Sequence, residues 1–381
     1  MEYRDFGNTG FRPSALGFGC MRLPLLEGEE NLIDEAEATR MIRYAIDQGV
    51  NYIDTAWPYH QGQSEPVVGR ILKDGYRERV ALATKMPSWL IEKEADFDSF
   101  FNSQLERLQT DHIDFYLLHT LNQEYWDKYL KFKVFNWAER QLADGRIRNL
   151  GFSFHDDFEV FERILTGYDH WDFCQIQYNY MDVDFQAGQR GLKMAADRGL
   201  GVVIMEPLKG GQLAKETPPA PVKAVFDRAE VDWKPAEWAL QWLWNQPEVG
   251  LVLSGMSAMR QVEENLISAS RSGVGSFGPA QTRLMEEARA AWKGVAPVAC
   301  THCEYCLPCP NEVLIPQIFE IYNNSVMYDL QARGKRRYER EIAAENRADQ
   351  CVECGTCESL CPQHLEIIQY LKDAHAYLRE E

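Results

Sequence analysis

Residues 16–21, Leu16-Gly17-Phe18-Gly19-Cys20-Met21, form the first of the short apolar runs that decide the fold. This run lacks the G-x-G-x-x-G spacing with which an open, doubly wound sheet holds a dinucleotide after its first strand. Further apolar, β-branched or aromatic runs lie at 51–56, 80–85, 113–119, 150–154, 173–178, 202–206 and 250–256. Together these runs predict eight strands.

Segments with helical periodicity separate the runs. They lie at 35–48, 64–73, 97–108, 156–165, 186–198, 235–244 and 258–269. A strand-then-helix alternation indicates parallel strands joined by right-handed crossovers. Eight such units over about 250 residues favour a closed (β/α)8 TIM barrel. A short hairpin that pairs Tyr3-Arg4 with Phe11-Arg12 is expected to close its bottom.

Composition and charge exclude several classes of protein. The 381 residues include 40 Lys+Arg and 58 Asp+Glu, a net charge of −18, which argues against non-specific binding to nucleic acid. No apolar run approaches the roughly 20 residues that cross a bilayer, and residues 1–5 do not begin a signal peptide. We therefore expect a cytoplasmic protein with neither a nucleic-acid nor a membrane partner.

The ten cysteines are unevenly placed. Cys20 and Cys174 lie within predicted strands, where we expect core residues rather than catalytic thiols. The other eight form two bursts, Cys300, Cys303, Cys306 and Cys309, then Cys351, Cys354, Cys357 and Cys361. Such spacing gathers sulfurs at one point, as a metal centre requires. The chain is therefore expected to divide into a barrel at 1–295 and a metal-binding domain at 296–381.

The second burst, Cys351-x2-Cys354-x2-Cys357-x3-Cys361-Pro362, has the spacing of bacterial [4Fe–4S] ligands. The first burst is one residue shorter before Cys309, so that zinc or a single shared cluster stays open there. In two-cluster ferredoxins the fourth cysteine of each burst ligates the other cluster. The expected ligand sets are Cys300, Cys303, Cys306 with Cys361, and Cys351, Cys354, Cys357 with Cys309.

Helical patterns at 315–323 and 337–345 lie between the bursts and predict a mainly helical ferredoxin-like domain. The basic run at 333–337 is expected to be a solvated helix face, and a docking patch for an acidic redox partner is the alternative.

Polar residues follow three consecutive predicted strands: Asp54 with Tyr59 just beyond it, Lys85, and His119. Taken singly, each has an ordinary structural interpretation, such as a turn residue, a wall residue or a solvated strand end. The carboxyl ends of barrel strands, however, share one rim, which is where chemistry collects in this fold. We therefore expect these four side chains to meet there.

Together the four residues form an acid–base device. A tyrosine has a pKa of about 10, and a nearby ammonium such as that of Lys85 lowers this value. Asp54 would anchor Lys85, and His119 would donate a hydrogen bond to a carbonyl oxygen where negative charge develops. Tyr59 would then protonate that oxygen while hydride arrives at the carbon.

These residues belong to stretches that resemble the aldo-keto reductase family over residues 3 to about 270. With its two cysteine bursts, the chain is similar to an iron–sulfur subgroup of that family, which has a C-terminal ferredoxin-like domain. The matching stretches are Tyr-Arg-x-Phe-Gly-x-Thr-Gly at 3–10, Leu-Gly-Phe-Gly-Cys-Met-Arg-Leu at 16–23, Ile-Asp-Thr-Ala at 53–56, Ser-Glu at 64–65, Thr-Lys at 84–85, Leu-Leu-His at 117–119 and Glu-Asn at 264–265. The resemblance makes Asp54, Tyr59, Lys85 and His119 the family's catalytic tetrad. It also implies NADP or NAD bound without a Rossmann domain, and a small carbonyl or alcohol substrate.

The resemblance further implies cofactor-binding positions. Ser153 and Gln175 match residues that hold the carboxamide, Met205 replaces an aromatic that stacks on the nicotinamide, and Gly255 and Ser257 open a helix that could hold a phosphate. Asn265 is a further candidate. The chain departs from the family at Phe154, where asparagine is common. It also has Gln261 where an arginine is expected and Arg260 one position early, so the choice between NADH and NADPH stays undecided.

Hydride transfer moves two electrons, whereas each cluster accepts one, and we find no flavin signature. We therefore expect the barrel to perform the hydride chemistry, and two [4Fe–4S] clusters to stabilise the tail, sense redox state or serve a redox protein partner. The alternative is a non-catalytic nicotinamide-sensing scaffold with an electron-transfer or docking module. Trp57, Tyr59, His60 and Trp89 are either pocket walls for an apolar or sugar-like ring or ordinary loop packing.

Overall fold

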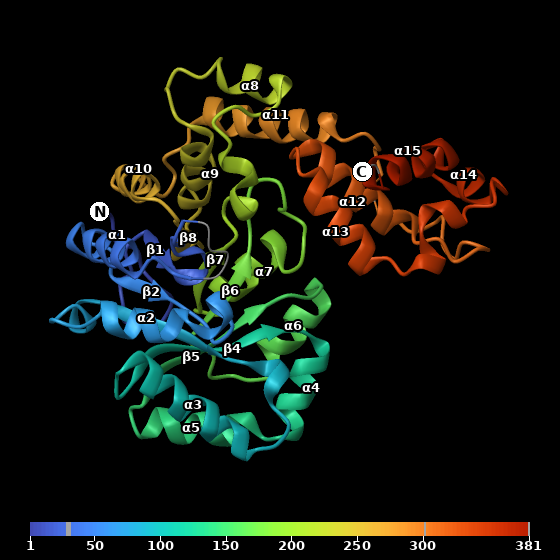
Figure 1. The fold of residues 1–381 in the computed structure, drawn as a ribbon. Helices are drawn as coiled ribbons and strands as arrows, with labels where there is room; N and C mark the ends of the chain where they lie inside the picture. Colours follow the sequence, from blue (N-terminus) through green and yellow to red (C-terminus); the bar gives the residue numbers. More distant parts are fainter. Residues whose placement is uncertain (28–31, 301, 380–381) are drawn as a thin grey trace. The chain divides into compact units, whose positions relative to one another are not determined.

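The computed structural model of the chain describes residues 1–27, 32–300 and 302–379. Within them, eight parallel strands close into a barrel in chain order (Figure 1). The strands are β1 (Leu16–Gly19), β2 (Tyr52–Asp54), β3 (Ala81–Met86), β4 (Ile113–Leu121), β5 (Ile147–Phe154), β6 (Phe173–Gln177), β7 (Gly201–Met205) and β8 (Leu251–Gly255). β1 pairs with β8, which completes the ring and confirms the predicted TIM barrel.

Helices follow the strands and pack their apolar faces against the outside of the barrel. They are α1 (Glu35–Asp47), α2 (Ser64–Ile71), α3 (Ala95–Leu108), α4 (Gln123–Lys131), α5 (Val134–Ala143), α6 (Phe158–Thr166), α7 (Gly188–Asp197), α9 (Pro235–Trp244) and α10 (Met259–Ala269). The amphipathic periodicity that predicted these helices reflects this one-sided burial. Two helices, α4 and α5, fill the connection between β4 and β5.

A separate apolar cluster fills the inside of the barrel and includes the rings of Phe6, Tyr52, Phe115 and Phe173. The Phe6 ring lies 5.6 Å from that of Phe115 and 6.2 Å from that of Phe173. The N-terminal segment folds back on itself as expected, but the pairing differs from the prediction: Tyr3 forms an antiparallel bridge with Ser14, and Arg4 N–H donates to the carbonyl oxygen of Pro13. The Phe6 ring of the N-terminal segment, rather than a pair of strands, closes the interior of the barrel.

The strand ends are less regular than the sequence indicated. β1 ends at Gly19, and Cys20–Arg22 form a short 3-10 helix instead of continuing the strand. β4 runs past His119 to Leu121, with a shift in its pairing with β5 between Leu118 and Leu121. An irregularity of this kind changes the direction in which a strand side chain projects.

Contacts divide the chain into two compact units. The barrel unit comprises residues 1–215 and 233–278, and the second unit comprises 216–232 and 279–381. Residues 279–295 thus group with the tail, together with the segment 216–232. The predicted domain boundary between 295 and 296 stays a prediction.

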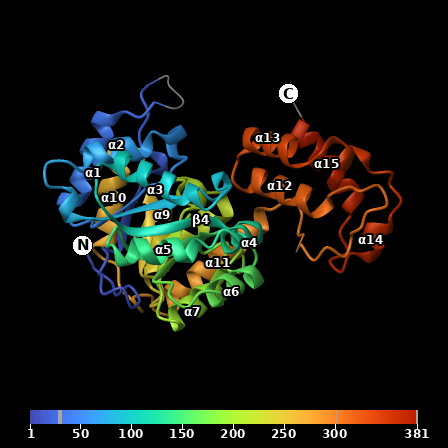
Figure 2. The same ribbon diagram turned by 90° about the horizontal axis from the view of Figure 1, so that it is seen from below.

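The second unit is mainly helical, in agreement with the sequence (Figure 2). It contains α8 (Ala220–Phe226), α11 (Pro279–Val295), α12 (Ile315–Met327), α13 (Gln331–Glu341), α14 (Thr356–Leu360) and α15 (Ile367–Arg379). α12, α13 and α15 pack against one another around a core that includes Phe319, Tyr338 and Leu371. No helix in the described part of the chain is long and apolar enough to cross a membrane.

Candidate functional site

Lys85 forms the centre of a buried cluster at the carboxyl ends of β2 and β3. Its Nζ donates to both carboxylate oxygens of Asp54 at 2.7 Å and to the carbonyl oxygen of Thr55 at 2.9 Å. The same nitrogen lies 3.4 Å from the hydroxyl of Tyr59. Lys85 is fully buried and Asp54 is 2% exposed, so water does not screen this ion pair.

Tyr59 opens a short turn, Tyr59–Gly62, with an unusual backbone. His60 has φ 50° and Gln61 has φ 53°, and Gly62 follows with φ 87°. Left-handed conformations cost residues with a Cβ about 1–2 kcal/mol each. Other contacts must therefore hold this turn in place.

His119 lies beside Tyr59 at the end of β4. The two rings meet edge to face with centroids 6.3 Å apart, and the Trp89 ring lies 5.3 Å from the imidazole. His119 is 8% exposed, and its Nδ1 is buried without a hydrogen-bond partner among the described residues. The structure thus gathers Asp54, Tyr59, Lys85 and His119 at one rim.

Burial and charge set the protonation of this cluster. Burial alone would lower the pKa of Lys85, but Asp54 and Tyr59 outweigh it and raise the pKa above its ordinary value. Burial raises the pKa of Tyr59 above its ordinary value, and Lys85 opposes this rise, which is the direction expected of the ammonium. Burial, with help from Lys85 and His155, lowers the pKa of His119 well below its ordinary value. The site therefore contains an ammonium, a neutral phenol and a neutral imidazole.

Ser153, Gln175 and Met205 lie on three neighbouring strands of the same rim. Ser153 pairs in register with Gln175, and Gln175 Nε2 lies 3.5 Å from the Met205 sulfur. Ser153 Oγ accepts a hydrogen bond from the backbone N–H of Thr120 at 2.8 Å. Gln175 Oε1 is buried and lacks a partner in the part of the chain that the structure describes. A buried acceptor of this kind suits a ligand that brings an N–H group.

The residues predicted to bind a phosphate at the end of β8, and their neighbours on α10, contact other residues of the protein. Gln261 Oε1 accepts from the backbone N–H of Ser257 at 2.8 Å, and Arg260 Nε donates to Glu264 at 2.7 Å. Gly255 lies at the exposed end of β8, where a Cβ would meet the stem of Arg22 at 3.4 Å. Asn265 Nδ2 donates to Ser254 Oγ at 3.1 Å and ties α10 to β8. Asn265 is thus turned toward the protein's own strand.

The aromatic residues predicted as pocket walls have different surroundings. Trp89 lies against His119, whereas Trp57 packs on Phe100 with ring centroids 5.1 Å apart. His60 accepts a hydrogen bond at Nε2 from the backbone N–H of Leu23 at 3.0 Å. Sequence reasoning missed His155, which directly follows β5 and is close enough to affect His119. Its place at a strand's carboxyl end was the signal that could have found it.

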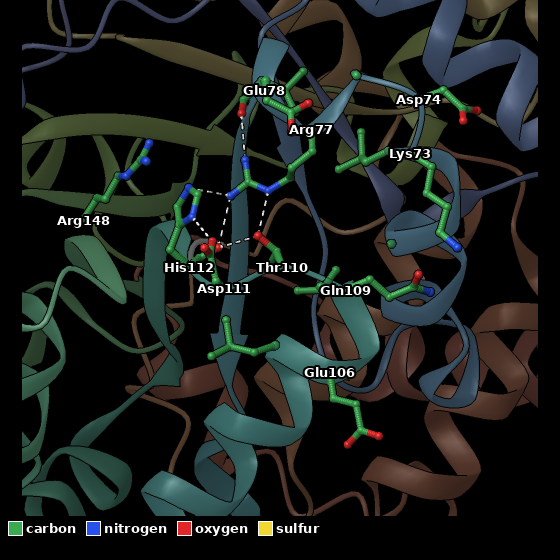
Figure 3. Close-up of a pocket in the computed structure, with 16 residues that line it drawn as sticks. Lys73, Asp74, Arg77, Glu78, Glu106, Gln109, Thr110, Asp111, His112 and Arg148 are labelled. Carbon is green, nitrogen blue, oxygen red and sulfur yellow. Dashed lines mark hydrogen bonds and ion pairs between the residues drawn. The ribbon is translucent and has the colours of Figure 1, made fainter.

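A cavity of about 880 Å³ lies among residues that precede β3 and β4 (Figure 3). Its lining includes Arg77 and His112, and Arg77 donates to His112 Nε2 at 3.1 Å and pairs with Asp114 at 2.8 Å. Asp114 also pairs with Arg148 at 2.7 Å. These residues lie at the amino-terminal ends of strands, and their charges pair with one another. We therefore interpret the residues around this cavity as a stabilising network and not as the reaction site.

Seven of the eight cysteines of the tail fall into two groups. Cys300, Cys303, Cys306 and Cys361 line one small cavity together with Ile315 and Phe319. Burial, together with the nearby thiols of Cys351 and Cys309, raises the pKa of Cys357 to about 11. Both groupings bring the fourth cysteine of one burst to the other burst. Among the described residues, no three His, Cys, Asp or Glu side chains are placed to hold a single metal ion.

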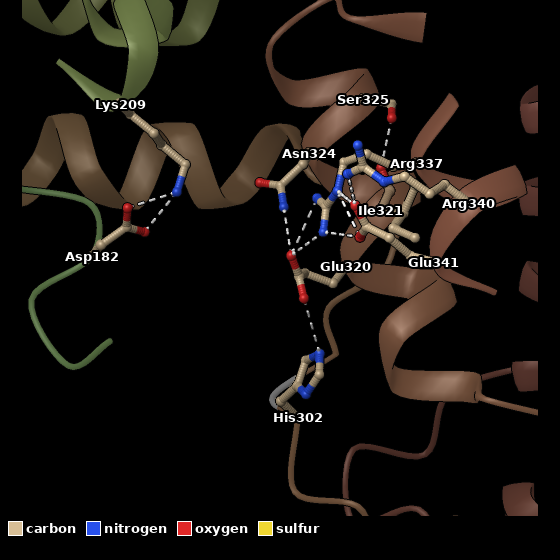
Figure 4. A network of polar contacts seen from close by, with 10 residues as sticks. All are labelled: Asp182, Lys209, His302, Glu320, Ile321, Asn324, Ser325, Arg337, Arg340 and Glu341. Carbon is tan, nitrogen blue, oxygen red and sulfur yellow. Dashed lines mark hydrogen bonds and ion pairs between the residues drawn. The ribbon is translucent and has the colours of Figure 1, made fainter. Parts of the chain in front are cut away.

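Charged residues of α12 and α13 form a network next to the first burst (Figure 4). Glu320 pairs with Arg337 at 3.3 Å and lies 3.9 Å from His302 Nε2. Arg337 also pairs with Glu341 at 2.9 Å. Within the basic run at 333–337, Arg337 is therefore engaged inside the unit, while Arg333 and Arg336 are exposed as expected of a solvated face. Figure 4 also shows Lys209 paired with Asp182 at 2.6 Å, which joins the loops after β6 and β7 of the barrel.

Comparison with known proteins agrees with this geometry. The model of the Aldo/keto reductase family matches residues 15–272, which include every residue of the rim cluster. The chain belongs to the aldo/keto reductase family. The model of the 4Fe-4S dicluster domain matches residues 299–366, so this family member carries such a domain after its barrel.

Relatives and solved structures cover most of the barrel. L-galactose dehydrogenase of Arabidopsis thaliana is 28% identical over 306 residues, which are 75% of this chain and 93% of that protein. NADH-specific methylglyoxal reductase of Escherichia coli is 27% identical over 316 residues, covering 70% of this chain and 93% of the relative. The aldo-keto reductase AKR11C1 from Bacillus halodurans, in its holo form, superposes with a TM-score of 0.63 at 26% identity, covering 76% of this chain and 96% of that one.

Proposed function

We propose that the barrel reduces an aldehyde or ketone with NADH or NADPH, or oxidises the alcohol, and that Tyr59 is the general acid and base. The observation that carries this proposal is the 3.4 Å contact between the Tyr59 hydroxyl and Lys85 Nζ, which Asp54 holds in place. Members of the family that resemble this chain act on small carbonyl or alcohol compounds, as the names L-galactose dehydrogenase and methylglyoxal reductase state.

The residues of the rim fit a nicotinamide. The unpartnered Gln175 Oε1 and the Ser153 hydroxyl would hold the carboxamide, and Met205 would cover one face of the ring. When bound, this cofactor supplies or accepts the hydride. The polar groups on β5 and β6 would fix its orientation, because their register places Ser153 beside Gln175.

The chain's own residues would handle the proton. In the reduction, Tyr59 donates its phenolic proton to the substrate oxygen, and Lys85 at 3.4 Å stabilises the phenolate that remains. Asp54 keeps Lys85 charged although both side chains are buried. Neutral His119 donates a hydrogen bond to the same oxygen, where negative charge develops. Because His119 is not an imidazolium, it does not compete with Tyr59 as the acid.

We further propose that the eight tail cysteines ligate two [4Fe–4S] clusters, one held by Cys300, Cys303, Cys306 and Cys361 and the other by Cys309, Cys351, Cys354 and Cys357. The shared cavity of the first set and the proximity of Cys357 to Cys309 support this crossed arrangement. Each cluster stores one electron. We propose that the clusters stabilise the tail, sense redox state or serve a one-electron partner, and that they stand outside the hydride step.

Tyr59→Phe tests the reaction. This substitution removes only the hydroxyl and is expected to lower kcat for both directions by at least about 10³-fold, while NADH binding, followed by quenching of tryptophan fluorescence, stays within about 3-fold of wild type. Tyr76→Phe, on the outer surface of the barrel unit, is the matched control. A wild-type rate of carbonyl reduction by the Tyr59→Phe protein would refute the proposal.

A further inference from the structure

The strained turn that carries Tyr59 is held from two sides by side chains with no part in the chemistry described above. On one side, His60 Nε2 accepts the backbone N–H of Leu23 at 3.0 Å, which ties the turn to the segment that follows β1. On the other side, Arg107 of α3 donates from Nη2 to the carbonyl oxygen of Gly62, where the turn ends. The left-handed residues therefore lie between two anchors.

Arg107 is itself fixed by buried partners. Its Nη1 lies 3.2 Å from Oε2 of Glu65, which is fully buried, and its guanidinium covers the Trp57 ring at 4.2 Å from the centroid. Glu65 Oε1 accepts from Thr84 Oγ1 at 2.6 Å and from Gln104 Nε2 at 2.8 Å. A guanidinium can make such contacts simultaneously because its donors form a planar fork.

The same network reaches the strand that carries Lys85. Gln104 Nε2 also donates to the backbone carbonyl oxygen of Lys85 at 2.9 Å, and Gln104 Oε1 accepts from Tyr116 at 2.6 Å. One buried carboxylate, Glu65, is thus connected to both sides of the contact between Tyr59 and Lys85. Displacing the turn would change their separation directly.

We propose that His60 and Arg107 are positioning residues that fix the distance between the Tyr59 hydroxyl and Lys85 Nζ by holding the left-handed turn 60–62. This inference rests on the proposed role of Tyr59 as the acid. Because the turn has φ values that His60 and Gln61 rarely adopt, losing an anchor lets it relax toward ordinary conformations. The phenol would then move away from the ammonium.

The test compares His60 variants that separate the anchor from the strain. His60→Leu removes the acceptor, His60→Gly removes it while tolerating positive φ, and His60→Gln supplies another acceptor. With 4-nitrobenzaldehyde as the probe substrate, kcat is expected to fall by about 10- to 100-fold in the first two, with KM and NADH binding within about 3-fold of wild type. His60→Gln is expected to regain most of the rate. The exposed His170→Leu is the matched control.

Arg107→Lys gives the second arm. It retains the charge beside Glu65 but not the planar pair of donors, so kcat is expected to fall by about 10-fold without loss of folding. Arg163→Met, on the exposed face of α6, is the control. Crystal structures of the His60→Gly and Arg107→Lys proteins provide a readout independent of turnover. A Tyr59–Lys85 contact longer than the present 3.4 Å is expected.

The outcomes separate the two proposals. A kcat within about 2-fold of wild type for His60→Leu, or equal losses in His60→Leu and His60→Gln, would overturn the positioning role. An inactive wild-type protein would instead overturn the proposed function. In that case the crystal structures still decide the inference, and an unchanged Tyr59–Lys85 contact in His60→Gly and Arg107→Lys contradicts it.

Discussion

Replacing Lys85 with methionine removes the ammonium on which the proposed chemistry depends, and its consequences follow from the contacts. Lys85 Nζ lies 2.7 Å from each oxygen of Asp54. At that distance and an effective dielectric constant of about 20, the Coulomb attraction is about 6 kcal/mol, much of which offsets the cost of burying both charges. Lys85→Met leaves Asp54 as a lone buried carboxylate and should lower the free energy of unfolding by about 3–5 kcal/mol.

The double variant Asp54→Leu with Lys85→Met separates stability from chemistry. Removing both charges also removes the lone-charge penalty, so this protein should lie within about 2 kcal/mol of wild type. Because each single variant should lose about 3 kcal/mol or more, the coupling energy should be about 4 kcal/mol or more. Its kcat should still be about 10³-fold below wild type, because Tyr59 has lost the ammonium at 3.4 Å that stabilises its phenolate.

The assays are guanidinium denaturation of the barrel, followed by tryptophan fluorescence under anaerobic conditions, and steady-state carbonyl reduction. Single variants within about 1 kcal/mol of wild type would show that the buried pair is not formed as described. A stable double variant with wild-type turnover would show that the ammonium has no chemical role.

Three further outcomes are expected. Burial raises the pKa of Tyr59 above its ordinary value of 10.0, so the acid form persists through neutrality. The rate of carbonyl reduction should therefore stay constant between about pH 6 and 9, whereas the rate of alcohol oxidation, which needs the phenolate, should rise over that interval. A reduction rate that falls near about pH 7 would contradict this expectation. Asp114→Ala leaves the Arg77 guanidinium without its buried partner and should lower the free energy of unfolding by about 3 kcal/mol, with kcat unchanged. A large loss of kcat would instead show that this network takes part in the reaction. Cys361→Ser should reduce bound iron from about eight to about four atoms per chain, with buried Cys174→Ser unchanged as control, and full iron in the first variant would refute the crossed ligand set.

Much of the barrel could be predicted because its local rules repeat. Each strand is a short apolar run buried on both faces, and each helix has one apolar side, so periodicity alone separates them. Residues at strand ends such as Asp54, Lys85 and His119 could be placed at one rim because parallel strands in a closed sheet end together. The pairing within the N-terminal segment could not be predicted in this way, because Phe6 is fixed by distant rings on β4 and β6 rather than by its neighbours in sequence.

Sequence by itself determined the barrel, the two bursts of cysteines and the side chains proposed to react, since these depend on spacing and residue type. Only the tertiary structure decided how those side chains are charged and held. The pKa of Tyr59 is raised rather than lowered because burial outweighs the ammonium, and burial is a property of the packed rim. Likewise, the anchors of the turn at 60–62 come from Leu23 and Arg107, which lie far from it in the chain and meet it only after folding.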